Sequence, residues 1–243
     1  MTQPNTRIQT EVSVSHPLFS TYPALAKALQ GYVHKKQYEH GDRILSHGDG
    51  ATQLWLVLDG WVKLSRQTPD GKETIIGLCT AGDIFGEAAL FAHANYPYTV
   101  EAMGKQVVLA TIDALAIRSQ VEKDSKLSVH IMSMLSERNA KTQLKLEHIN
   151  TMSAAQRLGC FLLRLCALQT SGAKSLHIPV EKNVLAAYLG MKPETLSRSQ
   201  QQLKPLGIQI AGERVEITNI DRLREFVCGS CSESGMGSCE GEN

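Results

Sequence analysis

The chain has 243 residues, of which 42% are hydrophobic and 20% are charged, and its formal net charge is +1. These values are ordinary for a globular protein and exclude a polyelectrolyte, so nucleic-acid binding requires a local concentration of Lys and Arg. No apolar run approaches the roughly 20 residues that cross a bilayer, and the N-terminus lacks the apolar core of a signal peptide. We therefore expect a cytoplasmic protein with no membrane partner and one large or two modest domains.

Residues 23–123, which follow an N-terminal segment of residues 1–22, have the pattern of a β-rich domain. Short apolar runs alternate with glycines that recur roughly every 10 residues, which is typical of an antiparallel barrel or jelly roll. Asp59–Gly60 predicts a hairpin, and Pro69–Gly71 predicts another turn. The expected strands cover residues 53–58, 61–65, 74–78, 98–102 and 106–111.

Residues 124–153 are predicted to form one long helix, because residues 126–152 contain neither Pro nor Gly and are rich in helix-forming residues. One register spaces its residues alternately three and four apart, as in a coiled-coil seam with a polar centre. Such a seam is most useful between two chains, so we expect a homodimer; the alternative is a helix that packs on its own β domain. The seam residues are Met132, Leu135, Asn139, Thr142, Leu146 and Ile149.

Residues 154–227 predict a winged helix-turn-helix domain that binds double-stranded DNA. Gly190 ends the second of its helices, and Pro193 suits the first turn of the third. Two short helices joined by a glycine-containing turn and followed by a hairpin define this motif. The fold class is therefore α+β: a jelly roll, a dimerisation helix and a winged helix-turn-helix. The expected helices cover 155–168, 181–189 and 193–203, the hairpin covers 208–217, and the residues expected to be buried are Leu185, Leu189, Leu196 and Leu203.

The helix after Pro193 carries the residues expected to read DNA. Glu194 and Arg198 are four residues apart and therefore share one helix face. Taken alone they would form a surface ion pair worth at most a few tenths of a kcal/mol. On a recognition helix, Glu accepts from a cytosine amino group, Arg donates to guanine, and the Ser197 hydroxyl serves either partner. The predicted DNA contacts are Lys192, Glu194, Thr195, Ser197, Arg198 and Gln201.

Several short motifs are spread over both predicted domains. They are Gly41–Asp42, Gly48, Gly60, Gly71–Glu73, Gly82–Asp83, Phe85–Glu87, Leu90–Phe91 and Gly190–Arg198. With these motifs the chain resembles the CRP/FNR family of bacterial transcription regulators over residues 30–226. The resemblance implies an effector-sensing jelly roll, a dimer along the long helix, and control of RNA polymerase at promoters.

The resemblance also discriminates within the family. Cyclic-AMP-binding members place an Arg-Ser pair where this chain has Pro97–Tyr98, and neither residue supplies the cation that a buried phosphodiester needs. Thr142 matches an adenine-contacting position, but one hydroxyl cannot replace the Arg, so a cyclic-nucleotide-binding module is only the alternative. Glu194, Ser197 and Arg198 match the oxygen-responsive branch, which implies a TTGAT-type half-site in an inverted repeat.

The tail, residues 228–243, carries three of the six cysteines as Cys228-x2-Cys231-x7-Cys239. In a reducing compartment such thiols suit zinc or an iron–sulfur cluster, both of which usually take four ligands. Family members with an N-terminal cysteine cluster have no match here, since the first 78 residues contain no Cys. Members with three C-terminal cysteines and a carboxylate ligand from the long helix resemble the chain better. We expect an oxygen- or nitric-oxide-sensitive cluster; the alternatives are a cofactor-free thiol redox switch and an uninvolved tail. The candidates for the fourth ligand are Cys160, Cys166, Glu137, Glu147 and an exogenous group.

Haem in the barrel is a further alternative, since related nitric-oxide regulators use it. A lone His is more often a surface residue than an axial ligand, so haem ranks below the cluster. We find no nucleophile–base arrangement, phosphate-binding glycine loop or HExxH motif, so we do not expect an enzyme. The histidines available to haem are His16, His34, His40, His47 and His93.

Overall fold

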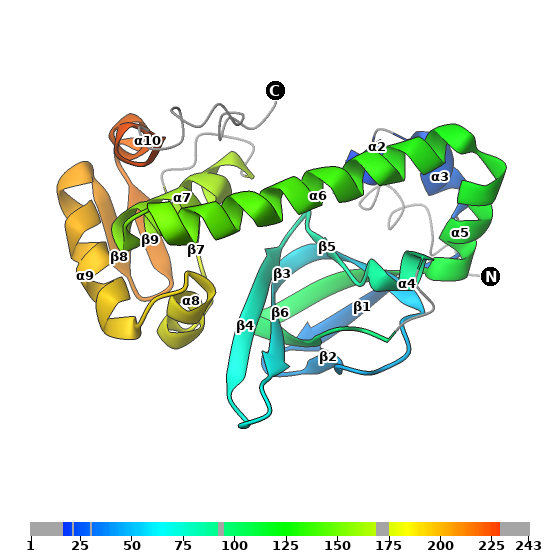
Figure 1. The fold of residues 1–243 in the computed structure, drawn as a ribbon, viewed down its shortest axis with the longest axis horizontal. Helices are drawn as coiled ribbons and strands as arrows, with labels where there is room; N and C mark the ends of the chain where they lie inside the picture. Colours follow the sequence, from blue (N-terminus) through cyan, green and yellow to red (C-terminus); the bar gives the residue numbers. More distant parts are fainter. Residues whose placement is uncertain (1–16, 21, 30, 92–94, 169–174, 229–243) are drawn as a thin grey trace. The chain divides into compact units, whose positions relative to one another are not determined.

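The computed structural model describes residues 17–20, 22–29, 31–91, 95–168 and 175–228. The chain forms two compact units, Met1–Asn139 and Ala140–Asn243. The long helix α6 (Ser125–Thr151) is continuous and contributes to both of them (Figure 1). Of the helices described, none is both long and apolar enough to cross a membrane. The predicted α+β fold class is confirmed, and the helix predicted over 126–152 is α6.

The first unit is built on an antiparallel sheet in which β1, β6, β3 and β4 are neighbours in that order. Two short strands extend it, β2 on β6 and β5 on β3 (Figure 1). The remaining elements of the unit are helices, and none of those before residue 124 was predicted from the sequence. The bounds are β1 (Val33–Glu39), β2 (Arg43–Leu45), β3 (Gln53–Gln67), β4 (Glu73–Thr80), β5 (Ile84–Phe85), β6 (Thr99–Asp113), α2 (Pro17–Ser20), α3 (Pro23–Ala28), α4 (Ala88–Phe91) and α5 (Ala114–Lys123).

Two buried apolar clusters stabilise this unit. One joins the sheet to the helices and includes Leu54, Ile112 and, from α6, Ile131. The other lies within the roll, where the rings of Trp55 and Phe85 stack with their centroids 5.8 Å apart. The β-roll therefore has its own core, and the first part of α6 packs on that core.

The chain does not reverse at Asp59–Gly60, so the predicted hairpin is wrong. β3 continues through both residues and pairs with β6 on either side of them. A two-residue hairpin turn of the predicted type needs positive φ at both central positions. Among the described residues only glycines have positive φ, and Gly60, at +85°, bends the strand where a Cβ would lie 2.6 Å from the Gln106 carbonyl oxygen. The strands predicted over 98–102 and 106–111 are likewise one bent strand, β6.

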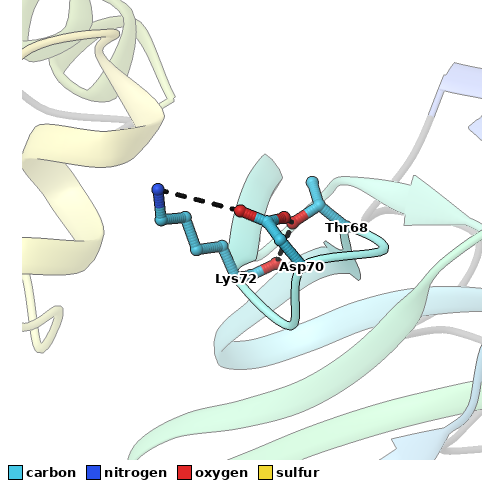
Figure 2. Close-up of polar contacts among 3 residues, drawn as sticks. All are labelled: Thr68, Asp70 and Lys72. Carbon is cyan, nitrogen blue, oxygen red and sulfur yellow. Dashed lines mark hydrogen bonds and ion pairs between the residues drawn. The ribbon is translucent and has the colours of Figure 1, made fainter.

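The turn predicted at Pro69–Gly71 is confirmed, and it joins β3 to β4 (Figure 2). The Thr68 amide donates to the Lys72 carbonyl at 2.8 Å, and the Thr68 hydroxyl contacts both that carbonyl and the Asp70 carboxylate. Lys72 Nζ lies 3.8 Å from Asp70 Oδ2, an exposed pair that contributes little to stability. The turn thus relies on its backbone and hydroxyl contacts.

The second unit combines helices with a small sheet ordered β7-β9-β8. The three helices predicted before residue 204 and the hairpin after it are confirmed. The sequence did not predict β7 or α10, and α10 includes the backbone of Cys228, which we had assigned to the tail. The bounds are α7 (Ala154–Ala167), β7 (Ser175–His177), α8 (Lys182–Tyr188), α9 (Pro193–Leu203), the 3-10 helix η1 (Lys204–Leu206), β8 (Ile208–Ala211), β9 (Arg214–Ile217) and α10 (Ile220–Cys228).

Candidate nucleic-acid interface

The turn between α8 and α9 is closed by backbone hydrogen bonds around Gly190. Gly190 has φ of +66°, its amide donates to the Ala187 carbonyl at 3.1 Å, and the Met191 amide donates to the Ala186 carbonyl at 3.0 Å. This is the pattern of a helix that ends at a left-handed glycine. Pro193 then begins α9, as expected. The four leucines expected between the helices, Leu185, Leu189, Leu196 and Leu203, are all buried.

Arg157 on α7 holds this turn in place. Its Nε donates to the Leu189 carbonyl at 3.0 Å, its Nη1 to the Met152 carbonyl at 2.8 Å, and its Nη2 to the Gly190 carbonyl at 3.4 Å. One guanidinium therefore connects the end of α6, the start of α7 and the turn before α9. Sequence reasoning missed this residue, although a cation in a largely apolar helix was a usable signal.

The exposed face of α9 carries charge. Glu194, Arg198 and Gln201 are exposed, as is Lys192 at the N-cap position, whereas Thr195 and Ser197 are half-buried. In the described part of the chain, Glu194 and Arg198 form no ion pair with one another, although they lie one turn apart. Both charges therefore point to solvent without mutual neutralisation.

The hydroxyls of α9 are partly engaged within the helix. Ser197 Oγ donates to the Pro193 carbonyl at 2.9 Å, which leaves the hydroxyl oxygen as an acceptor. Ser199, which the sequence analysis did not single out, is buried and donates to the Thr195 carbonyl at 2.9 Å. Of the two serines, only Ser197 retains access to a ligand.

The long helix α6 has two apolar faces. Leu127 and Ile131 are buried in the core of the β-roll, and the seam residue Leu135 is half-buried against the same core. The other five seam residues are exposed: Met132 at 60%, Asn139, Thr142, Leu146 at 59% and Ile149 at 41%. The helix therefore packs on its own β unit with one face and leaves apolar residues of the predicted seam exposed on another.

In the β-roll, the Gly86 amide and the Glu87 carboxylate both have partners within the protein itself. The Gly86 amide donates to the buried Tyr98 hydroxyl at 2.8 Å, and burial raises the pKa of Tyr98 to about 12. The Glu87 carboxylate forms an ion pair with Arg138 of α6, whose guanidinium also donates to the Ile84 carbonyl at 3.1 Å. Both groups are thus already engaged inside the unit.

Replacing Tyr98 by Phe is expected to lower the free energy of unfolding of the β-roll by about 1–2 kcal/mol, because the buried Gly86 amide then loses its acceptor. The measurement is urea unfolding followed by tryptophan fluorescence, since both tryptophans, Trp55 and Trp61, lie on β3. Tyr32→Phe is the control, because Tyr32 is 51% exposed. Equal stability of the two variants would contradict the role of the hydroxyl.

The cysteines lie partly outside the described residues. This applies to Cys231 and Cys239, whereas the backbone of Cys228 ends α10. Cys160 and Cys166 on α7 are half-buried, and Cys160 Sγ lies 3.9 Å from His148 Nδ1. Within residues 17–228, apart from the undescribed gaps, no three His, Cys, Asp or Glu side chains gather closely enough to hold a metal. Of the other candidates, Glu137, His34, His40 and His47 are exposed, Glu147 is half-buried, and His16 and His93 lie outside the described residues.

The β-roll, the long helix and the winged helix-turn-helix define a regulator that couples a sensory domain to a DNA-binding domain. Residues 35–124 match the family model of the cyclic nucleotide-binding domain, and residues 156–226 match that of the Crp-like helix-turn-helix domain. The chain belongs to the CRP/FNR family of transcription regulators. Regulators of this family bind DNA and typically act as dimers.

Individual relatives agree with this assignment. The chain is 28% identical to the nitrogen fixation regulation protein FixK of Rhizobium meliloti, over 69% of this chain and 74% of FixK. It is 24% identical to the CRP-like cAMP-activated global transcriptional regulator of Mycobacterium tuberculosis H37Rv, over 83% of this chain and 91% of that protein. A solved regulatory protein from Silicibacter pomeroyi DSS-3 is similar with a TM-score of 0.71 and 29% identity, over 91% of this chain and 99% of that one. The chain is thus a transcription regulator and not an enzyme.

Proposed function

We propose that the protein is a homodimeric regulator that recognises a TTGAT-type inverted repeat and responds to a redox or gas signal at its C-terminal cysteines. The observation that carries the DNA part is the arrangement on α9, where Glu194 and Arg198 are exposed one turn apart and are not paired with each other. Ser197 lies between them with its oxygen available to accept. Carboxylate, hydroxyl and guanidinium match the donor and acceptor pattern of base edges in the major groove.

A signal other than a cyclic nucleotide is supported by the β-roll. The Gly86 amide is bonded to Tyr98, and the Glu87 carboxylate is paired with Arg138. Pro97–Tyr98 adds no cation, and a buried phosphodiester without one would be an uncompensated charge. We therefore expect no heat of binding when cyclic AMP is titrated into the protein in a calorimeter.

An iron–sulfur cluster suits the donor set better than haem does. The tail sequence offers three thiols, the usual ligands of such clusters. The described histidines that we considered for haem, His34, His40 and His47, are exposed instead of facing the interior of the roll. When bound, the cluster would be the group that reacts with oxygen or nitric oxide. The protein would dimerise, bind DNA through α9 and contact RNA polymerase.

The test compares DNA binding with and without oxygen. Protein purified anaerobically is expected to bind a labelled TTGAT inverted repeat, and brief exposure to air should weaken this binding about tenfold or more, a coupling of roughly 1–3 kcal/mol. The absorption spectrum of the same sample identifies the cofactor, because iron–sulfur proteins absorb broadly near ~400 nm and haem gives a sharp Soret band. Equal binding in both states would refute the sensing part alone. Failure to prefer the repeat over scrambled DNA would refute the DNA part.

A further inference from the structure

Cys160 and His148 lie against each other where α6 turns into α7. His148 is near the C-terminal end of α6 and Cys160 is in the middle of α7, and Cys160 Sγ lies 3.9 Å from His148 Nδ1. That distance is within hydrogen-bonding reach of a sulfur atom, and both side chains are half-buried, so the thiol retains access to solvent. A nucleophile within reach of a base is the arrangement that activates thiols in proteins. The pair has no part in the DNA-reading face of α9.

His148 is suited to accept the proton of this thiol. Burial lowers the pKa of His148, and the neighbouring Glu147 carboxylate opposes this shift without cancelling it. The imidazole is therefore neutral at pH 7, and a neutral ring can accept a hydrogen bond at one nitrogen, whereas an imidazolium cannot. His148 can thus take the proton from Cys160 when the sulfur attacks.

Cations flank the thiol along α7. Arg157 precedes Cys160 by three residues and Arg164 follows it by four, so each lies about one turn away. Arg164 is exposed, and Arg157 donates to three neutral carbonyls, which leave its charge uncompensated. Reactive cysteines occur in such electropositive, partly exposed surroundings, because nearby cations favour the thiolate.

A further cation comes from α6. Lys145 lies one turn before His148, and its Nζ is 3.8 Å from the centroid of the Tyr188 ring. The Tyr188 ring packs edge-on against the ring of Phe161, the residue after Cys160, with their centroids 5.8 Å apart. Lys145 therefore belongs to the same corner of the unit. Together with the two arginines of α7, it outweighs the carboxylate beside His148.

We propose that Cys160 is a modification site, at which the thiol forms a mixed disulfide with an anionic low-molecular-weight disulfide and His148 acts as the general base. Oxidised glutathione, a disulfide of two acidic tripeptides, belongs to this class of reagent. The cations around the thiol suit the negative charge of such a reagent. The site does not involve the C-terminal cysteines and therefore goes beyond the proposed function.

The reaction is a thiol–disulfide exchange. The Cys160 thiol gives its proton to His148 Nδ1 while its sulfur attacks one sulfur of the reagent. A bond forms between Cys160 Sγ and that sulfur, the S–S bond of the reagent breaks, and the leaving thiolate takes the proton from His148. Cys160 is oxidised to the mixed disulfide, and half of the reagent leaves as a reduced thiol. An excess of that thiol reverses the reaction.

Modification of Cys160 would disturb the contact between α6 and α7. The 3.9 Å between Cys160 Sγ and His148 Nδ1 leaves no room for a tripeptide, so the two helices must move apart at this point. Arg157 lies about one turn away on α7 and bonds to the end of α6 and to the turn before α9. The modification would therefore loosen that turn and weaken DNA binding.

The first test measures which thiol reacts. Reduced full-length protein is incubated with oxidised glutathione at pH 7 without oxygen, alkylated and digested with trypsin. Cleavage after Arg157 and Arg164 separates Cys160 from Cys166, the other half-buried cysteine of α7, so mass spectrometry gives the rate at each. Burial raises the pKa of the Cys166 thiol, and we expect Cys160 to react at least about tenfold faster. Equal rates at the two cysteines would overturn the proposal.

A substitution at His148 tests its role as the base. His148→Gln keeps a hydrogen-bonding side chain but removes the base, and it should slow the reaction of Cys160 at least about tenfold. His130→Gln is the control, because His130 is also a half-buried histidine of α6 but stacks on Tyr22, and it should leave the rate unchanged. A purely structural role of His148 would be rescued by Gln, so an unchanged rate in His148→Gln would refute the general base.

The second test measures the effect on DNA binding by fluorescence anisotropy with the labelled TTGAT inverted repeat. Treatment with oxidised glutathione should weaken binding about tenfold or more in the wild type and in Cys166→Ser, but not in Cys160→Ser. An equal loss in Cys160→Ser would assign the effect to another cysteine and overturn the link to α9. The first test needs no DNA and no cluster, so the modification site can be refuted while the proposed function stands, and the reverse also holds.

Discussion

Leu146→Glu is expected to convert the protein from a dimer to a monomer and to abolish tight binding to the two-part DNA site. Leu146 is 59% exposed on α6, and the other large exposed apolar seam residues are Met132 and Ile149. Burying a Leu side chain contributes about 1.5–3 kcal/mol, and twofold symmetry doubles this contribution in a dimer. The Glu would also place two like charges in the seam. Together these effects should raise the dimer dissociation constant at least about 100-fold.

Leu168→Glu is the matched control for this change, because Leu168 is also an exposed leucine, at 49%, but lies beyond the end of α7 and outside the seam. Sedimentation velocity over a range of protein concentrations gives the dimer dissociation constant of each variant. A Leu146→Glu protein that stays dimeric at the same concentrations as the control would show that the seam of α6 is not the interface. In that case the exposed apolar residues would need another explanation.

The helix-turn-helix was predictable because its signals are local. Gly190 ends α8 through its own left-handed backbone, and Pro193 begins α9 through its own ring, so each boundary depends on one residue. Leu185 and Leu189, four residues apart, and Leu196 and Leu203, seven apart, then identify the buried faces. None of this requires knowledge of which distant segment packs on the motif, and the α9 bounds match those predicted.

The prediction at Asp59–Gly60 failed because a turn signal does not distinguish a reversal from a bend. Either outcome places the Gly in a left-handed conformation, and only pairing with β6 on both sides of Gly60 decides between them. That pairing depends on residues about 40 positions away in the chain. The same limit explains why one bent strand was predicted as two in residues 98–111.

The parts of the site that sequence reasoning missed depend on contacts between distant segments. The place of α10 on α7 depends on the absence of a side chain at Gly159. The position of Arg157 in an apolar helix was visible in the sequence, but its three partners, the carbonyls of Met152, Leu189 and Gly190, were not. The pairing of Cys160 with His148 likewise emerges only once α6 and α7 are folded together. A list of candidate ligands was therefore obtainable from the sequence, but not the contacts that surround each of them.

Arg198→Ala is expected to weaken binding to the TTGAT inverted repeat about 30-fold or more, because a dimer loses two Arg–guanine contacts of about 1–3 kcal/mol each. Arg198 is exposed on α9, so the truncation should leave the fold unchanged. Arg222→Ala is the control: it removes one exposed charge from α10 and should reduce affinity only by the general electrostatic contribution. Fluorescence anisotropy with both variants at one fixed salt concentration gives the comparison.

A change in the DNA separates base reading from charge. When the guanine of each half-site is replaced by adenine, wild-type affinity should fall by about 1–3 kcal/mol per half-site, whereas the affinity of Arg198→Ala should barely change. The two changes then form a double-mutant cycle in which the coupling energy belongs to the contact between Arg198 and that base. If Arg198 only contacted phosphate, its loss would weaken binding to both sequences equally, and the coupling energy would be near zero. Such a result would place the guanine contact on another residue of α9 and leave Arg198 as an electrostatic contact.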